Sequence, residues 1–203
     1  MDNVLSKADR TKNFIIERTA EIFNKKGYAG TSLSDLTDAT GLTKGSIYGN
    51  FENKEEVALA VFDYNHKCVR KLIQQRIEKV TTYQDKLLVY ASVYDSFNKG
   101  NFPKGGCPVL NTAVEADDTH EALKKRAADA VINWKKNIQD LIACGIQNGE
   151  FKKELNSSVL ALSMIALIEG GIMIAKVTGN QSNLDQVMET LKMLIEQMKN
   201  TSI

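Results

Sequence analysis

The side chains with the clearest chemistry lie between residues 43 and 54. Lys44 and Asn50 have the donors and acceptors that bind the base edges of DNA, and the Tyr48 hydroxyl can donate to a phosphate. Lys54 stands at the expected start of a helix, where a cation beside free amide groups favours a phosphate. The stretch therefore predicts contacts to nucleic acid, with a solvated lysine as the alternative role for Lys44.

Small residues surround these side chains. Gly45 and Gly49 are poor helix formers, at a cost of up to ~1 kcal/mol each against alanine. Their presence in a predicted helix makes sense if another molecule must approach the backbone closely. The remaining residues predicted to touch DNA are hydroxyl residues at two helix starts: Thr31, Ser32, Thr43 and Ser46.

Two short helices position this stretch. They meet at Gly41-Leu42-Thr43, and their apolar residues are spaced to pack together on a preceding helix: Leu36, Ala39, Leu42, Ile47 and Phe51. Such an arrangement is a helix-turn-helix, in which the second short helix stays free to enter the major groove. The alternative is a packed helical segment with an incidental glycine turn.

The rest of the chain is also predicted to be helical, because no run of alternating residues indicates a sheet. The 203 residues are 43% hydrophobic and 25% charged, with a net charge of +1, so a DNA-binding role must depend on where charges sit. We expect an all-α fold of about nine helices, near residues 8–26, 33–40, 44–51, 54–80, 83–99, 108–117, 119–148, 157–178 and 183–200.

The pattern from Thr31 to Glu55 closely resembles the TetR family of bacterial regulators. The resemblance covers about residues 8–60 and rests on TSLxxLxxAxGLTKGSIYxxFxxKE in register. Many members have His or Tyr where this chain has Asn50, and an aromatic or polar residue at Gly49. Those positions often touch DNA, which puts the operator sequence, although not the binding mode, in doubt.

The resemblance implies two domains, a DNA-binding domain over residues 1–54 and a helical ligand-binding and dimerisation domain over 55–203. It implies a homodimer on a palindromic double-stranded DNA operator, released by a small-molecule inducer. The usual role of the family implies a repressor rather than an activator. A helix-turn-helix factor that acts without a ligand is the alternative.

The last two helices are apolar on more than one face, which favours a two-fold dimer over a monomer core. The residues predicted for this interface are Leu160, Met164, Ile168, Ile172, Leu184, Val187, Leu191, Leu194 and Met198. Candidate walls of the inducer pocket, with plain core packing as their alternative, are Tyr90, Tyr94, Phe97, Phe102, Cys107, Trp134 and Met164.

The segment Gly105-Gly106-Cys107-Pro108-Val109-Leu110-Asn111 resembles a TetR subgroup that includes the repressor of N-ethylmaleimide reductase. That resemblance implies a link to electrophile sensing. Cys107 precedes a proline at a predicted helix start, where free amides favour a thiolate. The alternatives are a reactive or ligand-proximal thiol and a small buried residue.

Other function classes lack support in the sequence. We find no nucleophile with a nearby base and no phosphate-binding glycine loop, so we expect neither an enzyme nor a cofactor. His66 and His120 lack partners at metal-ligand spacing, so we expect no metal site. Three widely spaced cysteines, and an N-terminus without a signal peptide, indicate a cytoplasmic protein. The apolar run 159–175 is broken by Ser163 and Glu169, which favours a buried helix and no membrane span.

Overall fold

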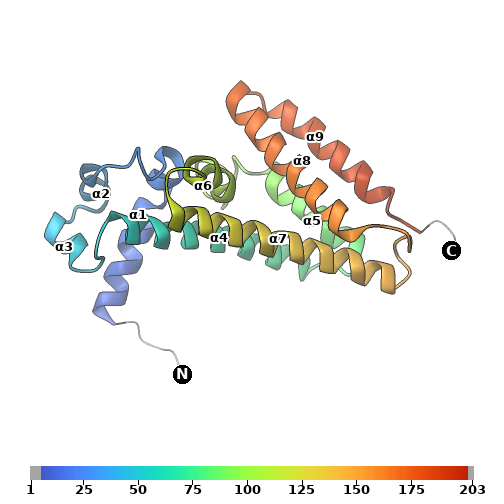
Figure 1. Ribbon diagram of the computed structural model, residues 1–203, viewed down its shortest axis with the longest axis horizontal. Coiled ribbons are helices and arrows are strands. Elements are labelled where there is room, and N and C mark those ends of the chain that lie inside the picture. Colours follow the sequence, from blue (N-terminus) through green and yellow to red (C-terminus); the bar gives the residue numbers. More distant parts are fainter. Residues whose placement is uncertain (1–5, 201–203) are drawn as a thin grey trace. The chain divides into compact units, whose positions relative to one another are not determined.

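A computed structural model describes residues 6–200 of the chain. Within that range the chain forms nine α-helices, shown in Figure 1, and one isolated antiparallel bridge between Phe151 and Lys199. The predicted all-α fold is confirmed. The helices are α1 (Lys7–Lys26), α2 (Leu33–Thr40), α3 (Lys44–Tyr48), α4 (Lys54–Ile77), α5 (Tyr83–Asp95), α6 (Pro108–Ala116), α7 (Glu121–Gln147), α8 (Ser157–Thr178) and α9 (Gln181–Glu196).

Helix ends follow local capping chemistry. Gly27 ends α1 with φ of 71°, a left-handed value that favours glycine, and its N–H bonds to Phe23 O. Helix α3 ends three residues earlier than predicted, at Tyr48, with Gly49 as its C-cap residue. Helix α4 ends three residues before its predicted end at residue 80, and α5 ends four residues before its predicted end at residue 99.

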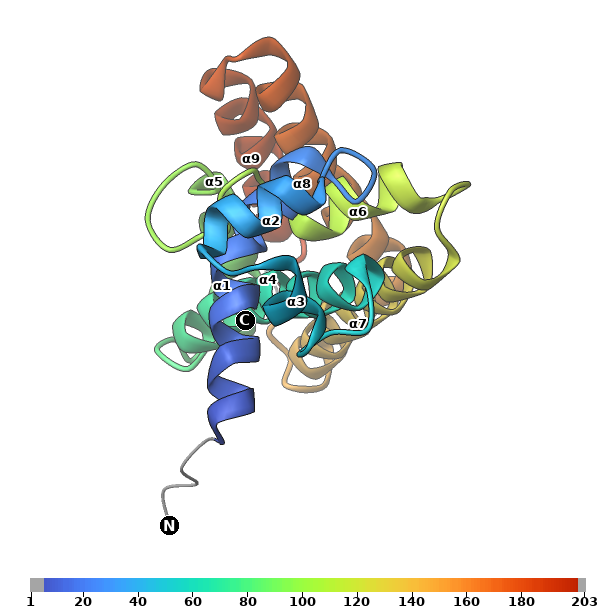
Figure 2. The same cartoon turned by 90° about the vertical axis from the view of Figure 1, so that its left-hand side faces the viewer.

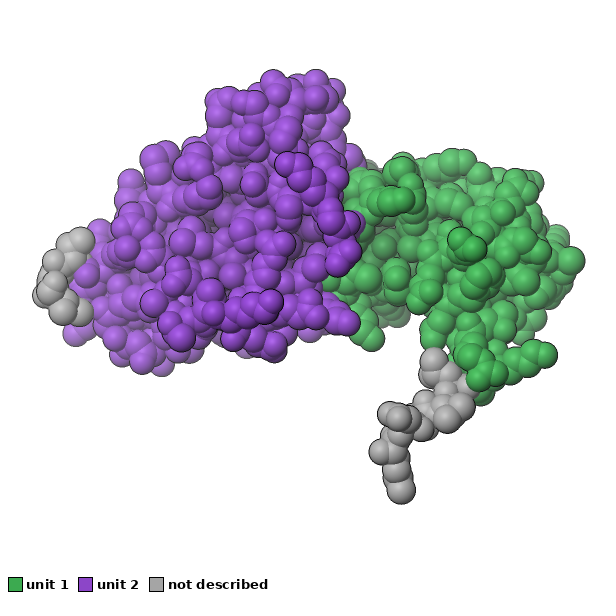
Figure 3. All heavy atoms as spheres, turned by 180° about the vertical axis from the view of Figure 1, so that it is seen from behind, with its two compact units in different colours: residues 1–68, 103–128 green, residues 69–102, 129–203 purple. Residues whose placement is uncertain are grey.

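The chain divides into two compact units, coloured in Figure 3. Unit 1 comprises residues 1–68 and 103–128, and unit 2 comprises residues 69–102 and 129–203. Helices α4 and α7 contribute residues to both units. Because α6 and its flanking loops cluster with the N-terminal helices, the units are not continuous in sequence. The predicted functional division at residue 54 stays a prediction.

The core of unit 1 joins α1, α2 and α3, which are labelled in Figure 2. Ile15 from α1, Leu36 from α2 and Ile47 from α3 have no exposed surface. Phe51, in the loop after α3, and Val57 of α4 are also buried. Ala39 and Leu42, predicted to join this core, are half-buried. Each short helix thus gains most of its stability from packing rather than from its own length.

Unit 2 contains α5, α8 and α9, and α8 packs along α9 and α5. Gly171 allows the close approach of α8 to α9, since a Cβ there would lie 2.8 Å from Leu184 Cδ1. Helix α8 is long and apolar enough to cross a membrane by length and composition alone, which is weak evidence. Its buried residues pack inside unit 2, as expected for a core helix: Ala161, Met164, Ile165, Ile168, Gly171, Ile172 and Ala175.

Candidate nucleic-acid interface

The turn between α2 and α3 is built from hydroxyl groups and one glycine. Gly41 has φ of 67° and ends α2, with its N–H bonded to Thr37 O. Thr40 Oγ1 donates to Leu36 O and accepts from Leu42 N at 3.2 Å. Thr43 then begins α3 by accepting from Ser46 N at 3.2 Å. The predicted glycine turn and the predicted Thr43 cap are both confirmed.

Helix α3 has one buried and one open face. Ile47 is buried, whereas Lys44, Gly45 and Gly49 are exposed and Tyr48 is half-exposed. Within the described residues, neither the Lys44 ammonium nor the Tyr48 hydroxyl has a hydrogen-bond partner. A cation and a phenol that are free on an exposed helix face are suited to phosphates and base edges.

Asn50 and Ser46 are tied to each other. Asn50 Nδ2 donates to Ser46 O at 2.9 Å, which occupies one donor of the amide and caps the end of α3. The Asn50 carbonyl oxygen remains the acceptor for any contact beyond the protein. Ser46 uses its backbone N–H for the Thr43 cap, and its side chain is half-exposed.

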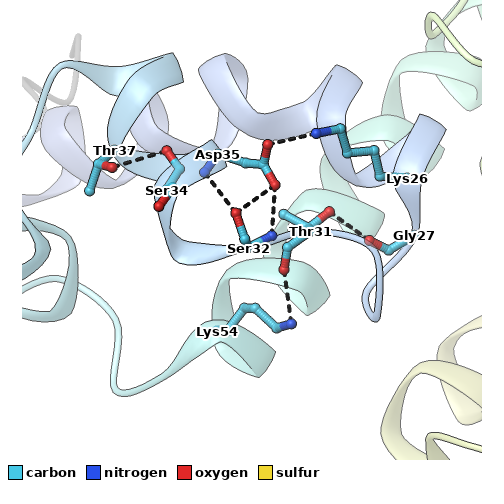
Figure 4. Close-up of polar contacts among 8 residues, drawn as sticks. All are labelled: Lys26, Gly27, Thr31, Ser32, Ser34, Asp35, Thr37 and Lys54. Carbon is cyan, nitrogen blue, oxygen red and sulfur yellow. Dashed lines mark hydrogen bonds and ion pairs between the residues drawn. The ribbon is translucent and has the colours of Figure 1, made fainter.

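The start of α2 is a capping box, drawn in Figure 4. Ser32 Oγ accepts from Asp35 N at 3.1 Å, and Asp35 Oδ2 accepts from Ser32 N at 2.7 Å. Asp35 also accepts from Lys26 Nζ at 2.6 Å. Ser32 is exposed, so it keeps its predicted place on the surface.

Thr31 does not reach the surface, so the structure does not favour its predicted contact with DNA. Its side chain is only 1% exposed, and its hydroxyl donates to Gly27 O at 2.6 Å (Figure 4). The physical reason is local, because a threonine just past a helix end satisfies the carbonyl that the helix leaves free.

Lys54 is also engaged inside the protein. Its Nζ donates to Tyr28 O at 2.9 Å and to Thr31 O at 3.0 Å, and lies 4.2 Å from the centroid of the Tyr28 ring. These contacts use two of the three N–H donors of the ammonium, and Lys54 is half-exposed. The structure thus gives Lys54 a role within unit 1, and its predicted phosphate contact stays a prediction.

The aromatic residues predicted to line an inducer pocket form a buried group in unit 2. The ring centroid of Tyr94 lies 4.9 Å from that of Trp134 in a stacked pair, and 5.6 Å from that of Phe102 in an edge-on pair. Tyr90, Phe97 and Met164 are buried as well. Burial raises the pKa of Tyr90 to about 12, so its hydroxyl stays protonated.

Trp134 is buried, and its Nε1 has no hydrogen-bond partner in the described part of the chain. A buried N–H without an acceptor costs on the order of 1–3 kcal/mol, so it marks a place where a water or a ligand atom would be favourable. A small cavity lies elsewhere, in unit 1 between α1, α4 and α6. Its volume of about 20 Å³ has room for about one water molecule.

Cys107 is the residue before α6 and has no exposed surface. Pro108 occupies the first turn of the helix as predicted, but the thiol makes no capping hydrogen bond to the helix. Burial of this kind favours the packing alternative over the reactive thiol, because the thiol is out of reach of a reagent unless the protein opens.

Most residues of the predicted dimer interface are buried within the protomer, so the structure does not favour them as an interface. Only Leu160, Val187 and Leu194 are half-exposed. The others fill the core of unit 2: Met164, Ile168, Ile172, Leu184, Leu191 and Met198. Both helices are apolar on several sides, so sequence pattern alone did not separate the face that packs inside from the face left outside.

Two family models match the chain. Residues 15–61 match the model described as bacterial regulatory proteins, tetR family, and residues 84–191 match the tetracyclin repressor-like, C-terminal domain. The chain belongs to the TetR family.

Similar proteins support the same conclusion. A TetR-family transcriptional regulator from Cytophaga hutchinsonii is 52% identical over 98% of this chain and 99% of its own, with a TM-score of 0.94. The transcriptional repressor DhaR of Mycobacterium sp. strain GP1 is 25% identical, over 94% of this chain and 97% of DhaR. Reduced NemR of E. coli, at 18% identity, 96% and 100% coverage and a TM-score of 0.81, shares the fold.

As a TetR-family member, the protein is a ligand-responsive, DNA-binding transcriptional regulator and not an enzyme. The helix-turn-helix of α2 and α3 is its DNA-binding element, which confirms the sequence-based prediction of function.

Proposed function

We propose that this protein is a repressor that binds a palindromic operator as a homodimer and is released by a small-molecule inducer. The observation that carries the proposal is the two-sided α3, which buries Ile47 and leaves Lys44 exposed and Tyr48 half-exposed, neither polar group paired within residues 6–200. A helix of five residues reads few bases, so a dimer that reads two half-sites about 34 Å apart supplies the missing affinity and specificity.

We assign the DNA contacts to the open side of the helix-turn-helix. In this proposal Lys44 reads base edges, Tyr48 binds a phosphate, and Gly45 admits the DNA backbone. The other contacts come from Ser32, Thr43, Ser46, Gly49 and the Asn50 carbonyl, all at exposed or half-exposed positions. Thr31 and Lys54 are left out, because their polar groups are engaged within the protein.

We assign the dimer interface to an apolar stripe on α8. The α8 stripe consists of residues spaced three or four apart on the outer side of the helix: Val159, Leu162, Ala166, Gly170, Met173 and Val177. Val177 is 80% exposed, and a Cβ on Gly170 would meet no atom of the protomer within 4 Å. A contiguous exposed apolar stripe with a small residue at its centre favours a second copy of the same helix across a two-fold axis.

We propose that the inducer binds beside the stacked pair of Tyr94 and Trp134. The unpaired Trp134 Nε1 favours a molecule with a hydrogen-bond acceptor, and the rings favour a flat or apolar body. The segment from Gly105 to Asn111 favours an electrophile-responsive subgroup, and the shared fold with NemR is compatible with it. Binding shifts the dimer toward a state whose α3 helices are wrongly spaced for successive major grooves.

The remaining assignments follow from this role. A regulator of this kind acts on chromosomal DNA, which supports a cytoplasmic location. We keep residues 1–54 as the DNA-binding domain and residues 55–203 as the ligand-binding and dimerisation domain. The two family models match within or close to these ranges, at residues 15–61 and 84–191.

The test is selection of operator DNA from a random pool by the purified protein, followed by binding at physiological salt with nonspecific competitor. We expect a palindromic sequence to be enriched and bound tightly. Lys44→Ala should relax discrimination between bases, whereas Tyr48→Phe should weaken binding to all sequences alike. Enrichment of no sequence by the wild-type protein would overturn the proposal.

A further inference from the structure

The loop that connects α1 to α2 is held from two sides by charged residues from other helices. We call residues 27–31 the 27–31 turn. It lies directly before Ser32, the N-cap residue of α2, so the position of the turn sets the position of the helix-turn-helix. All the residues that hold it belong to unit 1.

Glu115, near the end of α6, holds the amide side of the turn. Its two carboxylate oxygens accept from Tyr28 N at 2.9 Å and from Ala29 N at 2.8 Å. Gly27 makes room for this contact, because a Cβ there would overlap the Glu115 carboxylate. Two charge-assisted hydrogen bonds to successive amides are strong and directional, so they hold the turn in one position.

Lys54, the first residue of α4, holds the carbonyl side of the same turn. It donates to Tyr28 O and Thr31 O, so Tyr28 is bound at its N–H by Glu115 and at its C=O by Lys54. The Tyr28 ring is enclosed too, with the His120 ring edge-on to it at 4.5 Å between centroids. Tyr28 is thus contacted by α4, by α6 and by His120, the residue just before α7.

The α6 segment is anchored beside the turn by a second set of hydrogen bonds. Asn24 Nδ2 donates to Lys104 O and Gly106 O, each at 2.9 Å, and Asn111 Nδ2 donates to Asn24 O at 2.9 Å. Asn24 is buried and lies in the last turn of α1. A movement of α6 therefore pulls on the end of α1 and on the 27–31 turn together.

We propose that Glu115 and Lys54 are positioning residues for operator binding, which hold the 27–31 turn between them and so couple the placement of α6 to the helix-turn-helix. The inference rests on the proposed function and deepens it. It replaces the phosphate contact expected of Lys54 with an internal role, and it adds Glu115, a residue on no surface assigned to DNA.

The direction of the change in operator affinity of Glu115→Gln tests the inference. Removing an acidic charge strengthens DNA binding by electrostatics alone, whereas loss of the two hydrogen bonds to the turn weakens it. We expect roughly tenfold weaker binding of the selected operator for Glu115→Gln. The matched control is Glu121→Gln, an exposed glutamate at the start of α7, which should bind as well as wild type or better. Equal or tighter binding by Glu115→Gln would overturn the inference.

Lys54→Met gives a test by salt dependence. A lysine that binds phosphate contributes a slope of about −0.9 to the plot of log K against log salt concentration. We expect Lys54→Met to weaken operator binding with the slope unchanged, because the lysine acts through the turn. A slope smaller in magnitude by about one would show a phosphate contact and overturn the internal role.

The double variant and amide exchange separate positioning from loss of folding. If both residues act through one turn, the losses of affinity in the double variant should not add. Hydrogen exchange in Glu115→Gln should speed up at the Tyr28 and Ala29 amides, while the midpoint of thermal unfolding of the protein and hydrogen exchange in α7 and α8 stay unchanged. Additive losses, or unchanged exchange at both amides, would overturn the inference.

The same experiment distinguishes this inference from the proposed function. If the wild-type protein selects no operator, the proposed function fails and the inference falls with it. If the wild-type protein binds its operator and Glu115→Gln binds it equally well, the inference alone is wrong.

Discussion

The Asp35 carboxylate lies 2.6 Å from the Lys26 ammonium, joining the first turn of α2 to the last turn of α1. The hydrogen bond from Lys26, with further ones from the Ser32 backbone and hydroxyl, lowers the pKa of Asp35 from 3.8 to about 2. The charged form of Asp35 is therefore favoured in the folded protein. The pair fixes the start of α2 beside the end of α1.

We predict that Asp35→Asn lowers the free energy of unfolding at neutral pH and loses this effect in acid. Because the folded-state pKa is depressed, the stabilisation is present above about 3.8 and is lost as pH falls through about 2. Denaturant unfolding of both proteins between pH 7 and pH 2 measures the difference. A difference that is as large at pH 2 as at pH 7 would show that the Asp35 charge is not its source.

Replacing Gly45 should change operator affinity without lowering the free energy of unfolding. It is exposed on α3, and a Cβ there would meet only Thr43 Oγ1, at 4.0 Å. Gly45→Ala should leave the free energy of unfolding unchanged or raise it by up to ~1 kcal/mol, since alanine favours helix. Operator affinity should fall by about tenfold if DNA approaches the backbone here.

The control for Gly45 is Gly41, which needs a left-handed backbone at φ of 67°. Gly41→Ala should destabilise the fold by about 1–2 kcal/mol. A Gly45→Ala variant that is more stable and binds the operator normally would show that DNA does not come close to this residue.

The sequence predicted the helices and the helix-turn-helix well because both depend on local signals. The glycine turn at Gly41, the Thr43 cap and the inward pair of Ile47 and Phe51 are set by residue type and spacing over a few positions. These signals act within one helix or one turn, and the structure agrees with them.

The contacts that the sequence did not indicate depend on partners distant in sequence. Lys54 looks like a phosphate ligand until the carbonyls of Tyr28 and Thr31 are placed beside it. Glu115 was not singled out, since its two amide partners lie 87 and 86 residues away in the chain. The sequence did not indicate which face of α8 is covered, because a helix that is apolar on several sides gives no clear periodic signal for it.

The α8 stripe predicts how the protein assembles. Leu162 is 48% exposed on α8, and replacing it with glutamate puts charges against each other at the proposed two-fold interface. We expect Leu162→Glu to sediment as a monomer at concentrations where wild type is a dimer, and to bind the operator at least tenfold more weakly. Ile132→Glu, at an exposed apolar position on α7, should stay dimeric. A monomeric wild-type protein would rule out the stripe as a stable interface.

Burial predicts the order in which the three cysteines react. Cys107 has no exposed surface, whereas Cys68 and Cys144 are partly exposed. A thiol reagent at neutral pH should label Cys107 more slowly than the other two, at a rate limited by opening of the structure. Single-cysteine variants and mass spectrometry measure the three rates. Faster labelling of Cys107 would revive the electrophile-sensing thiol.

Trp134 is the only tryptophan in the chain, so its fluorescence reports directly on the proposed inducer site. Small molecules that release the protein from its operator should shift or quench this emission at the same concentrations. Trp134→Phe keeps a ring against Tyr94 and removes the unpaired Nε1–H. The smaller buried ring costs stability, but removing a buried donor offsets much of that cost, so we expect the free energy of unfolding to change by less than about 1.5 kcal/mol.

Inducer affinity should respond more strongly than stability, because the ligand loses its hydrogen-bond donor. We expect about tenfold more of an acceptor-bearing inducer to be needed for operator release from Trp134→Phe. Tyr90→Phe serves as the comparison at another buried ring of α5, whose hydroxyl stays protonated. Operator release from Trp134→Phe at wild-type inducer concentrations would place the ligand away from Nε1 and leave the buried donor to a bound water.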